Sequence, residues 1–182
     1  IAYYGPPEEG LAYFGQARGG NTATILPNDS AHARKYGRTI MLRDNVMSHP
    51  ESVAQARAAW NAAIVPAQQD DFDAKASVQR TLWHEIGHYL GVDRTADGRE
   101  LDAALQDSAD LFEEMKADLV ALEAVPQLQA TGYYTRAQAQ QLYAAGVLRV
   151  LQRNRPRRDQ PYNTMQLMTW NWFLAHGVLA FD

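Results

Sequence analysis

The sequence contains no cysteine, which excludes disulfide bonds and leaves only nitrogen and oxygen atoms as strong metal ligands. It has no apolar run near the ~20 residues that a membrane-spanning helix needs. It also lacks a strong excess of either charge, since a net charge of -4 gives no electrostatic case for nucleic-acid binding. No signal peptide is visible. Together with the lack of cysteine, this leads us to expect a cytoplasmic protein that uses neither a membrane nor nucleic acid as a partner.

What is present fits an ordinary globular chain. With 182 residues, of which 46% are hydrophobic and 21% charged, the chain is long enough for one domain with a core. It starts at Ile1 rather than at Met, and it ends at Asp182 directly after an apolar stretch. We therefore expect residues 1–182 to form a single catalytic domain that is a fragment or one lobe of a larger protein.

The pattern along the chain predicts a mainly α fold with a small β element. Residues 1–30 are rich in Gly, Pro and Asn and indicate loops, with candidate strands at Ala23 to Leu26 and at Thr39 to Leu42. Helices are expected from Glu51 to about Ile64, from a Ser77 cap to Leu90, from a Ser108 cap to about Ala124, from a Thr135–Gln138 capping box to about Gln152, and from an Asn163 cap to about Ala180. Pro126 should follow the third of these helices, and residues 92–107 should be turn-like.

The second expected helix carries an H-E-x-x-H pattern, from His84 to His88. Residues four apart on a helix lie on one face, so both histidines can bind a single ion, with Glu85 beside it. This arrangement suits one Zn²⁺ per chain, with Glu85 as the base that acts on a metal-bound water. The same helix should present Val78, Leu82, Ile86 and Leu90 to the core, because they recur every four residues.

A catalytic zinc site usually has three protein ligands, and the third is open to three readings. The extended motif H-E-x-x-H-x-x-G-x-x-H matches through Gly91, but position 94 is an arginine, which stays protonated and cannot ligate. Glu114 on the following helix is the second candidate. Asp118 lies four residues later on the same face and is placed to accept the other ring N–H of a ligating histidine. Glu113, about 100° away around the helix, is the third candidate or a second supporting residue.

These motifs together resemble those of the dipeptidyl peptidase III family of zinc peptidases. That family has H-E-x-x-x-H, or H-E-x-x-H in some bacterial members, followed by E-E-C-R-A-E. Residues 113–118 read E-E-M-K-A-D, so Met115 and Lys116 replace the cysteine and the arginine. The resemblance implies that Glu114, the second glutamate of the motif, is the third zinc ligand.

The resemblance continues outside the two zinc motifs. Residues 19–28, G-G-N-T-A-T-I-L-P-N, are similar to the family's G-x-x-x-P-N substrate strand, which implies that Asn28 contacts the peptide main chain. Ile25 stands where the family has a second asparagine. The family also has a histidine on a later helix that supports the transition state. The matching stretch around Met165 to Trp170 has none; Gln166 is its nearest polar residue, and His176 lies further along.

The resemblance implies a zincin-like lobe that hydrolyses peptide bonds and releases N-terminal dipeptides. Family members are longer and have two lobes, so a second lobe or chain is expected to complete the cleft around the peptide substrate. A zinc aminopeptidase, another zinc hydrolase and a catalytically silent metal-stabilised interaction domain are the alternatives. Five arginines near the last loop are expected to form a solvated basic face, with a grip on a peptide carboxylate as the other reading: Arg149, Arg153, Arg155, Arg157 and Arg158.

Overall fold

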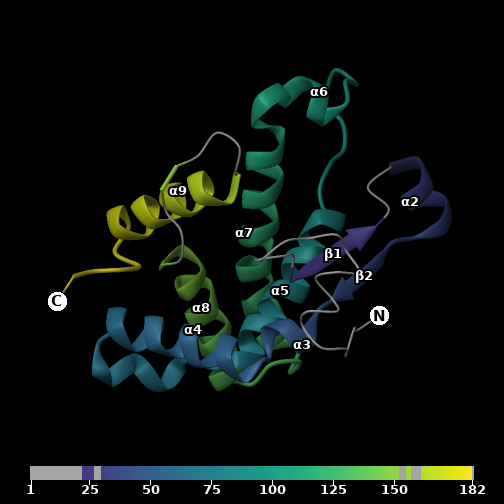
Figure 1. Cartoon of the computed structure of the whole chain (residues 1–182). Coiled ribbons are helices and arrows are strands. Elements are labelled where there is room, and N and C mark those ends of the chain that lie inside the picture. The colour runs from purple at the N-terminus through teal and green to yellow at the C-terminus, as the bar shows by residue number, and fades with distance from the viewer. Residues whose placement is uncertain (1–21, 27–29, 152–154, 157–160, 182) are drawn as a thin grey trace.

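The computed structural model describes residues 22–26, 30–151, 155–156 and 161–181. The described part is mainly helical with one small sheet, as the sequence predicts (Figure 1). Its elements in chain order are β1 (Ala23–Leu26), α2 (Ser30–Tyr36), β2 (Thr39–Leu42), α3 (Asp44–Met47), α4 (Pro50–Ala63), the 3-10 turn η1 (Pro66–Asp71), α5 (Ala74–Tyr89), α6 (Leu101–Leu105), the 3-10 turn η2 (Gln106–Ser108), α7 (Ala109–Ala130), α8 (Arg136–Leu151) and α9 (Pro161–Ala175). Among these helices, none is long and apolar enough to cross a membrane.

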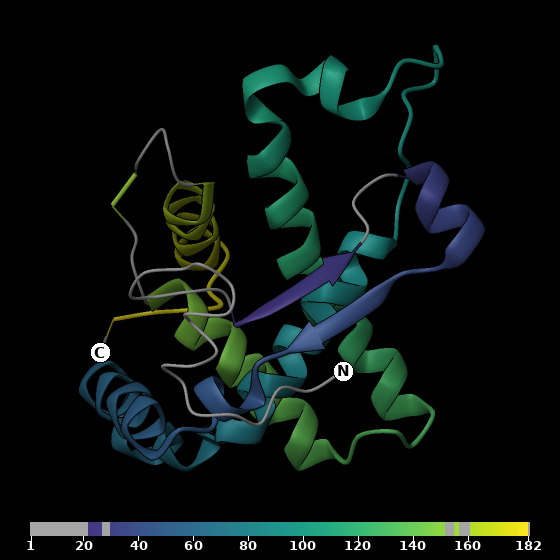
Figure 2. The same ribbon diagram turned by 45° about the vertical axis from the view of Figure 1, so that its right-hand side comes forward.

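The two strands form an antiparallel pair with the bounds that the sequence predicts. Ala23 lies opposite Leu42, and Leu26 lies opposite Thr39. The pair packs against α5, which it crosses in the view of Figure 2. Both β1 and the C-terminal half of α5 therefore border the same region of the molecule, which becomes one wall of the cleft described below.

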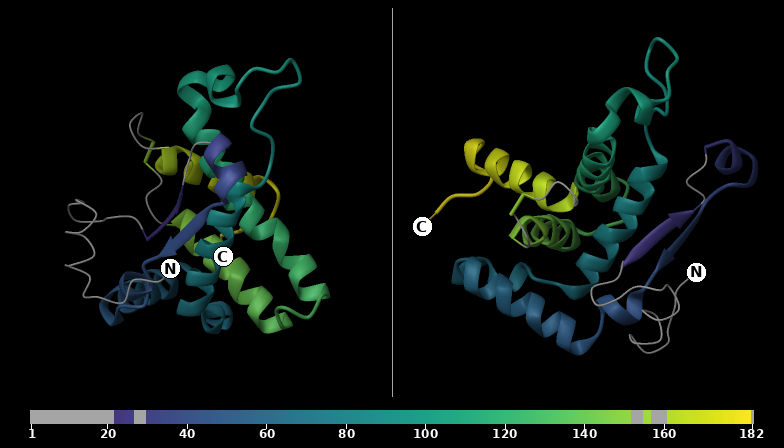
Figure 3. Two further views of the ribbon diagram at one scale, coloured as in Figure 1. Left: turned by 90° about the vertical axis from the view of Figure 1, so that its right-hand side faces the viewer. Right: turned by 45° about the horizontal axis from the view of Figure 1, so that its top comes forward.

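Helices α5 and α7 form the centre of the molecule and pack closely along one another (Figure 1). Helices α8 and α9 lie on the side of this pair that faces away from the strands, as the right-hand view of Figure 3 shows. Two clusters of buried side chains hold α8 in place. One joins it to α4, and the other joins it to α7 and to the loop before α8: Trp60, Phe72, Ala144 and Leu148 in the first, and Val125, Tyr134, Ala139 and Leu142 in the second.

The face of α5 that is buried differs from the predicted one. Val78, Leu82 and Ile86 are only half-buried, and Leu90 is exposed. The buried positions instead include polar and charged side chains, among them Arg80, Thr81, His84 and Glu85. Polar groups can be buried at moderate cost only when they are paired, and α7 supplies carboxylates opposite this face. The four-residue apolar spacing was thus a poor guide to the core side of this helix.

Two predicted helix starts are wrong. Helix α5 begins at Ala74 because the Asp73 carboxylate accepts a hydrogen bond from the Ala76 N–H at 2.8 Å, so Ser77 is not the cap. Helix α9 begins at Pro161, a residue that suits the first turn, and not after Asn163. By contrast, the predicted capping box before α8 is confirmed. The Thr135 N–H donates to Gln138 Oε1 at 2.9 Å, and the Gln138 N–H donates to Thr135 Oγ1 at 3.2 Å.

Helix α7 begins where predicted but runs past the expected end, through Pro126 to Ala130. Pro126 removes one helix hydrogen bond. The fully buried Val125 keeps the following turn packed against α8, which compensates for that loss. Ser108 makes no side-chain cap, because the preceding 3-10 turn continues directly into the helix with helical backbone angles.

Two further segments differ from their predicted secondary structure. Residues 92–107, predicted to be turn-like, contain the short helix α6. Helix α9 ends at Ala175, five residues early, because Gly177 adopts a left-handed φ of 69° that breaks the helix. Gly91 stops α5 in the same way, with a φ of 105°, as its position in the sequence predicts.

Gly87, between the two histidines, allows the close approach of α5 and α7. A Cβ atom there would lie 2.8 Å from the Ala117 Cα and 2.9 Å from the Ala117 carbonyl oxygen, both of them backbone atoms. We expect Gly87→Ala to lower the free energy of unfolding by up to about 2 kcal/mol, since overpacking costs about 1–3 kcal/mol and the gain in helix propensity offsets at most about 1. Thermal unfolding should show a fall in Tm of roughly 4–8 °C.

Gly146→Ala is the matched control, because a Cβ atom there meets only the flexible end of the Leu122 side chain. That side chain can rotate away, so this variant should change Tm little. A Gly87→Ala protein as stable as the parent would show that the two helices do not need this contact.

Candidate metal centre

Helix α5 presents both histidines of the H-E-x-x-H pattern to the same point. The ring centroids of His84 and His88 are 4.7 Å apart, with an angle of 89° between the ring planes. Their Nε2 atoms lie 3.1 Å from each other. The exposed fractions of the two side chains are only 9% and 15%, so the two rings face one another in a place largely shielded from solvent. Such a pair of facing nitrogens is the geometry of a metal site.

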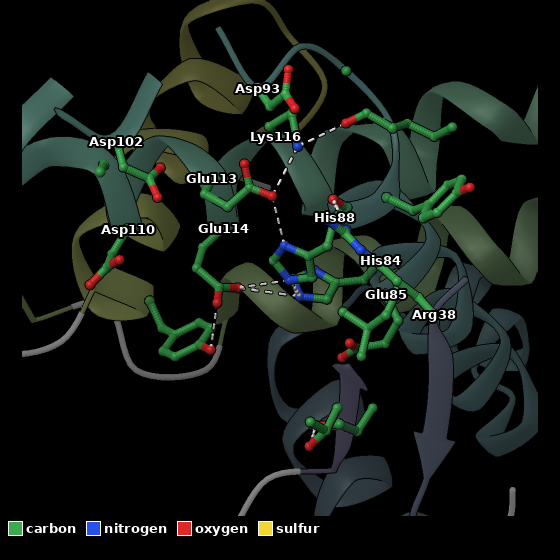
Figure 4. A pocket seen from close by; sticks show the side chains of 18 of the residues that line it. Arg38, His84, Glu85, His88, Asp93, Asp102, Asp110, Glu113, Glu114 and Lys116 are labelled. Carbon is green, nitrogen blue, oxygen red and sulfur yellow. Dashed lines mark hydrogen bonds and ion pairs between the residues drawn. The ribbon is translucent and has the colours of Figure 1, made fainter. Parts of the chain in front are cut away.

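Helix α7 adds a carboxylate oxygen to this pair. Glu114 Oε2 lies 3.3 Å from the Nε2 atom of His84 and 3.7 Å from that of His88 (Figure 4). This oxygen is buried and has no hydrogen-bond donor among the described residues. One ligand atom from each residue lies within 4.8 Å of the other two. A buried oxygen without a donor is costly by itself, and it fits a site in which a cation binds the two nitrogens and this oxygen together.

Each histidine is held through its other ring nitrogen by an acidic side chain of α7. His84 Nδ1 donates to Asp118 Oδ1 at 2.7 Å, and His88 Nδ1 donates to Glu113 Oε1 at 3.0 Å. With the protons on the Nδ1 atoms, the Nε2 lone pairs are available to a metal. Glu113 and Asp118 therefore contact the histidines on the side away from the Nε2 atoms. Figure 4 shows Glu114 facing the two histidines and Glu113 bonded to the other nitrogen of His88. Among the three readings of the third ligand, the geometry favours Glu114.

The residues of the discarded reading lie elsewhere. Arg94 is paired with Glu100 and donates to the Gly98 carbonyl oxygen at 2.9 Å. The neighbouring Asp93 carboxylate forms an ion pair with Arg34 at 2.6 Å. This loop therefore contributes no ligand atom near the two histidines.

The acidic side chains that contact the histidines are themselves paired with basic side chains of the protein. Asp118 Oδ1 also accepts from Arg80 Nη1 at 2.7 Å. Burial alone would raise the pKa of Asp118, but Arg80 and His84 outweigh it and hold this pKa far below its usual range. Lys116 Nζ donates to Glu113 Oε1 and to the Leu90 carbonyl oxygen, each at 2.9 Å. Lys116 thus joins the end of α5 to α7 at the position where the related motif has an arginine.

Two residues of this network were missed or misjudged from the sequence. The Tyr162 hydroxyl, from the first turn of α9, donates to Glu114 Oε1 at 2.8 Å. Burial and the nearby Glu114 carboxylate raise the pKa of Tyr162, so this hydroxyl stays protonated. Arg149, expected on a solvated face, instead points inward. Its Nε lies 3.5 Å from Asp118 Oδ2, and its guanidinium lies 5.4 Å from the centre of the Tyr162 ring.

No short spacing in the sequence links Tyr162 or Arg149 to the zinc motifs, so only the packing of α8 and α9 shows their role. Of the other arginines in the predicted basic face, Arg155 is exposed, and Arg153, Arg157 and Arg158 lie outside the described residues. The prediction of a solvated basic face is therefore wrong for Arg149.

The candidate centre opens into a cleft of about 1500 Å³ between β1, α5, α7 and the start of α9. Glu85 lines this cleft, and burial raises the pKa of its carboxyl group above the usual range, although the two nearby histidines act in the opposite direction. Gln166 is also buried in the cleft wall, with an Oε1 atom that lacks a donor among the described residues. His176 does not line the cleft. It is exposed, its ring stacks on Trp172, and its Nδ1 donates to the Trp172 carbonyl oxygen at 2.8 Å.

Part of the predicted substrate strand borders the same cleft. Thr22 to Ile25 line it along β1, so the strand that the sequence singled out lies beside the histidines. Asn28, the predicted contact for the peptide main chain, lies outside the described residues. Its expected role thus stays a prediction.

Comparison with solved structures identifies the architecture. Dipeptidyl peptidase III from Caldithrix abyssi matches 89% of this chain at 19% sequence identity, with a TM-score of 0.76. Dipeptidyl peptidase III from Corallococcus sp. strain EGB matches 89% at 24% identity, with a TM-score of 0.78. The chain has a dipeptidyl peptidase III-like fold. The predicted resemblance is therefore confirmed for the fold.

The dipeptidyl peptidase III-like chain is short beside these two proteins, since it covers 31% of the first and 30% of the second. No protein-family model matches its sequence, and no curated protein matches it significantly. The likeness at these identities is one of fold, so the chemistry must be argued from the side chains of this chain.

Proposed function

We propose that this chain is the zinc-binding part of a metallopeptidase that hydrolyses peptide bonds. The observation that carries the proposal is the convergence of His84, His88 and Glu114 on one point from two helices. Two nitrogens and one carboxylate oxygen are the ligand set of catalytic zinc sites that keep a fourth position for water. The fold of the two dipeptidyl peptidase III structures supports the same class of reaction.

The arrangement of side chains suits hydrolysis. A zinc ion bound by these residues would lower the pKa of its water and polarise the scissile carbonyl group. Glu85 would take the proton from the attacking water and return it to the leaving amine. A buried carboxyl group with a raised pKa suits this exchange. A group whose pKa is shifted towards neutral pH can both take up and release a proton during the reaction.

The cleft offers room for a peptide beside the ligands. Its wall along β1 would lie next to an extended substrate, with Asn28 as the proposed main-chain contact. We propose that the products are N-terminal dipeptides and that a second lobe or chain completes the cleft. The coverage of about a third of the related structures supports that second part.

A metal-stabilised interaction domain without activity is the main alternative from another class. Such a domain needs the two histidines and Glu114 but has no use for a buried glutamate that faces the cleft. Glu85 is buried at 7% exposure and lines the cleft, which favours the hydrolase. A zinc aminopeptidase uses the same groups, so only the products distinguish it.

Mass spectrometry of the products from a peptide library tests the proposal. We expect the zinc-loaded protein to release dipeptides, a chelator to abolish this release, and added zinc to restore it, because the ligands bind the ion reversibly. The same chelator saturated with zinc beforehand is the control and should leave the activity intact. Release of single amino acids would point to an aminopeptidase. No cleavage by a protein that holds one zinc ion and includes the second lobe or chain would contradict the proposed hydrolysis.

A further inference from the structure

The oxygen of Glu114 that faces away from the histidines has a partner of its own. Glu114 Oε1 accepts the Tyr162 hydroxyl proton at 2.8 Å, while Oε2 faces the two Nε2 atoms without a donor among the described residues. A carboxylate can bind a metal ion through one oxygen or through both. A hydrogen bond to one oxygen occupies a lone pair and orients the group, so the contact with Tyr162 favours binding through Oε2 alone.

Tyr162 is itself held by a charged side chain. The Arg149 guanidinium lies over the phenol ring, 5.4 Å from its centre. A cation over an aromatic face is attracted by the electrons of the ring, which fixes the position of the ring relative to α8. Arg149 in turn is fixed from its other side, because its Nε lies 3.5 Å from Asp118 Oδ2.

These contacts form a continuous chain of side chains around the candidate centre. Asp118 Oδ1 accepts from His84 Nδ1, Asp118 Oδ2 is next to Arg149, Arg149 lies over Tyr162, and Tyr162 donates to Glu114. This chain of contacts joins His84 on α5 to Glu114 on α7 through side chains of α8 and α9. A change in the packing of α9 would reach the third ligand by this route.

We propose that Tyr162 is a positioning residue that holds Glu114 to single-oxygen coordination, and that Arg149 keeps Tyr162 in place. The inference depends on the metal centre proposed above and concerns how its third ligand is oriented. An oriented carboxylate leaves one more position free for water and substrate than a carboxylate that binds through both oxygens.

Substitution of cobalt for zinc makes the coordination visible, because the absorption of Co²⁺ weakens when its coordination number rises from four to five. In Tyr162→Phe, both carboxylate oxygens become free to bind. We expect the variant to bind one zinc ion with an affinity about 10–100-fold lower, the usual effect of losing a hydrogen bond to a ligand. Its cobalt complex should absorb more weakly than that of the parent.

Tyr134→Phe is the matched control. Tyr134 is also buried, and its hydroxyl bonds with Trp83 and Gln79, but it makes no contact with Glu114 in the described structure. This variant should lower Tm while it leaves the cobalt spectrum unchanged. Arg149→Met provides a second test: it should shift the cobalt spectrum in the same direction as Tyr162→Phe.

The results separate the two levels of the proposal. Parental zinc affinity and an unchanged cobalt spectrum in Tyr162→Phe would overturn the positioning role, even though the centre binds metal. An effect no larger than that of Tyr134→Phe would show a merely structural role and would overturn it as well. A parent protein that binds neither zinc nor cobalt would instead contradict the metal centre itself.

Discussion

The Glu85→Gln variant should keep its zinc ion and lose peptide hydrolysis by about 10²–10⁴-fold, the range that a positioned proton-transfer group contributes. The amide keeps the shape of the side chain and can occupy the same buried place, but it cannot take up a proton. The Nε2 atoms of the neighbouring histidines and Glu114 Oε2 are unaffected by the change. Turnover of a peptide, measured beside the zinc content of the same sample, tests this expectation.

Glu123→Gln is the matched control, because it makes the same chemical change at an exposed position of α7 outside the cleft. It should have parental activity. Unaltered turnover in Glu85→Gln would exclude Glu85 as the base. Loss of zinc from Glu85→Gln would show instead that this residue supports the centre.

Replacement of Glu114 by alanine should lower the zinc affinity far more than the Glu85→Gln substitution does. The change removes the only carboxylate oxygen that faces both Nε2 atoms among the described residues and leaves two nitrogens to hold the ion. We expect the zinc affinity to fall by more than the roughly 10–100-fold that follows the loss of an outer hydrogen-bond partner. Competition with a chelator of known affinity measures this change directly.

Glu113→Ala is the neighbouring control on the same helix. Glu113 Oε1 accepts from His88 Nδ1 and from Lys116 and does not face the Nε2 atoms. Its loss should therefore cost only about 10–100-fold in zinc affinity, as for an outer partner. A greater loss in Glu113→Ala than in Glu114→Ala would exchange the two assignments.

Local patterns in the sequence predicted the elements whose cause is local. Both strands and the Thr135–Gln138 capping box were placed correctly, since β-branched residues and a reciprocal side-chain cap act over a few neighbouring residues. The continuation of α7 through Pro126 was not predicted, because the compensation comes from the burial of Val125 against another helix.

The candidate site follows the same division. The spacing of His84 and His88 and the second acidic motif brought three potential ligands into view, and the fold places their ligand atoms within 4.8 Å. Residue spacing alone left Glu113 and Glu114 as alternatives, because the two residues are adjacent, and only the resemblance to the peptidase family selected Glu114. The packing of α5 on α7 agrees with that choice, since it is Glu114 that faces the Nε2 atoms. Arg149 and Tyr162 reach the site from α8 and α9, respectively, so no local pattern reveals them.

The most direct test of the account is an anomalous-difference map from crystals of the zinc-loaded protein, recorded at the zinc absorption edge. We predict one peak per chain, bounded by His84 Nε2, His88 Nε2 and Glu114 Oε2. A zinc-saturated crystal with no peak between these three atoms, or with a peak bound by other side chains, would contradict the proposed centre.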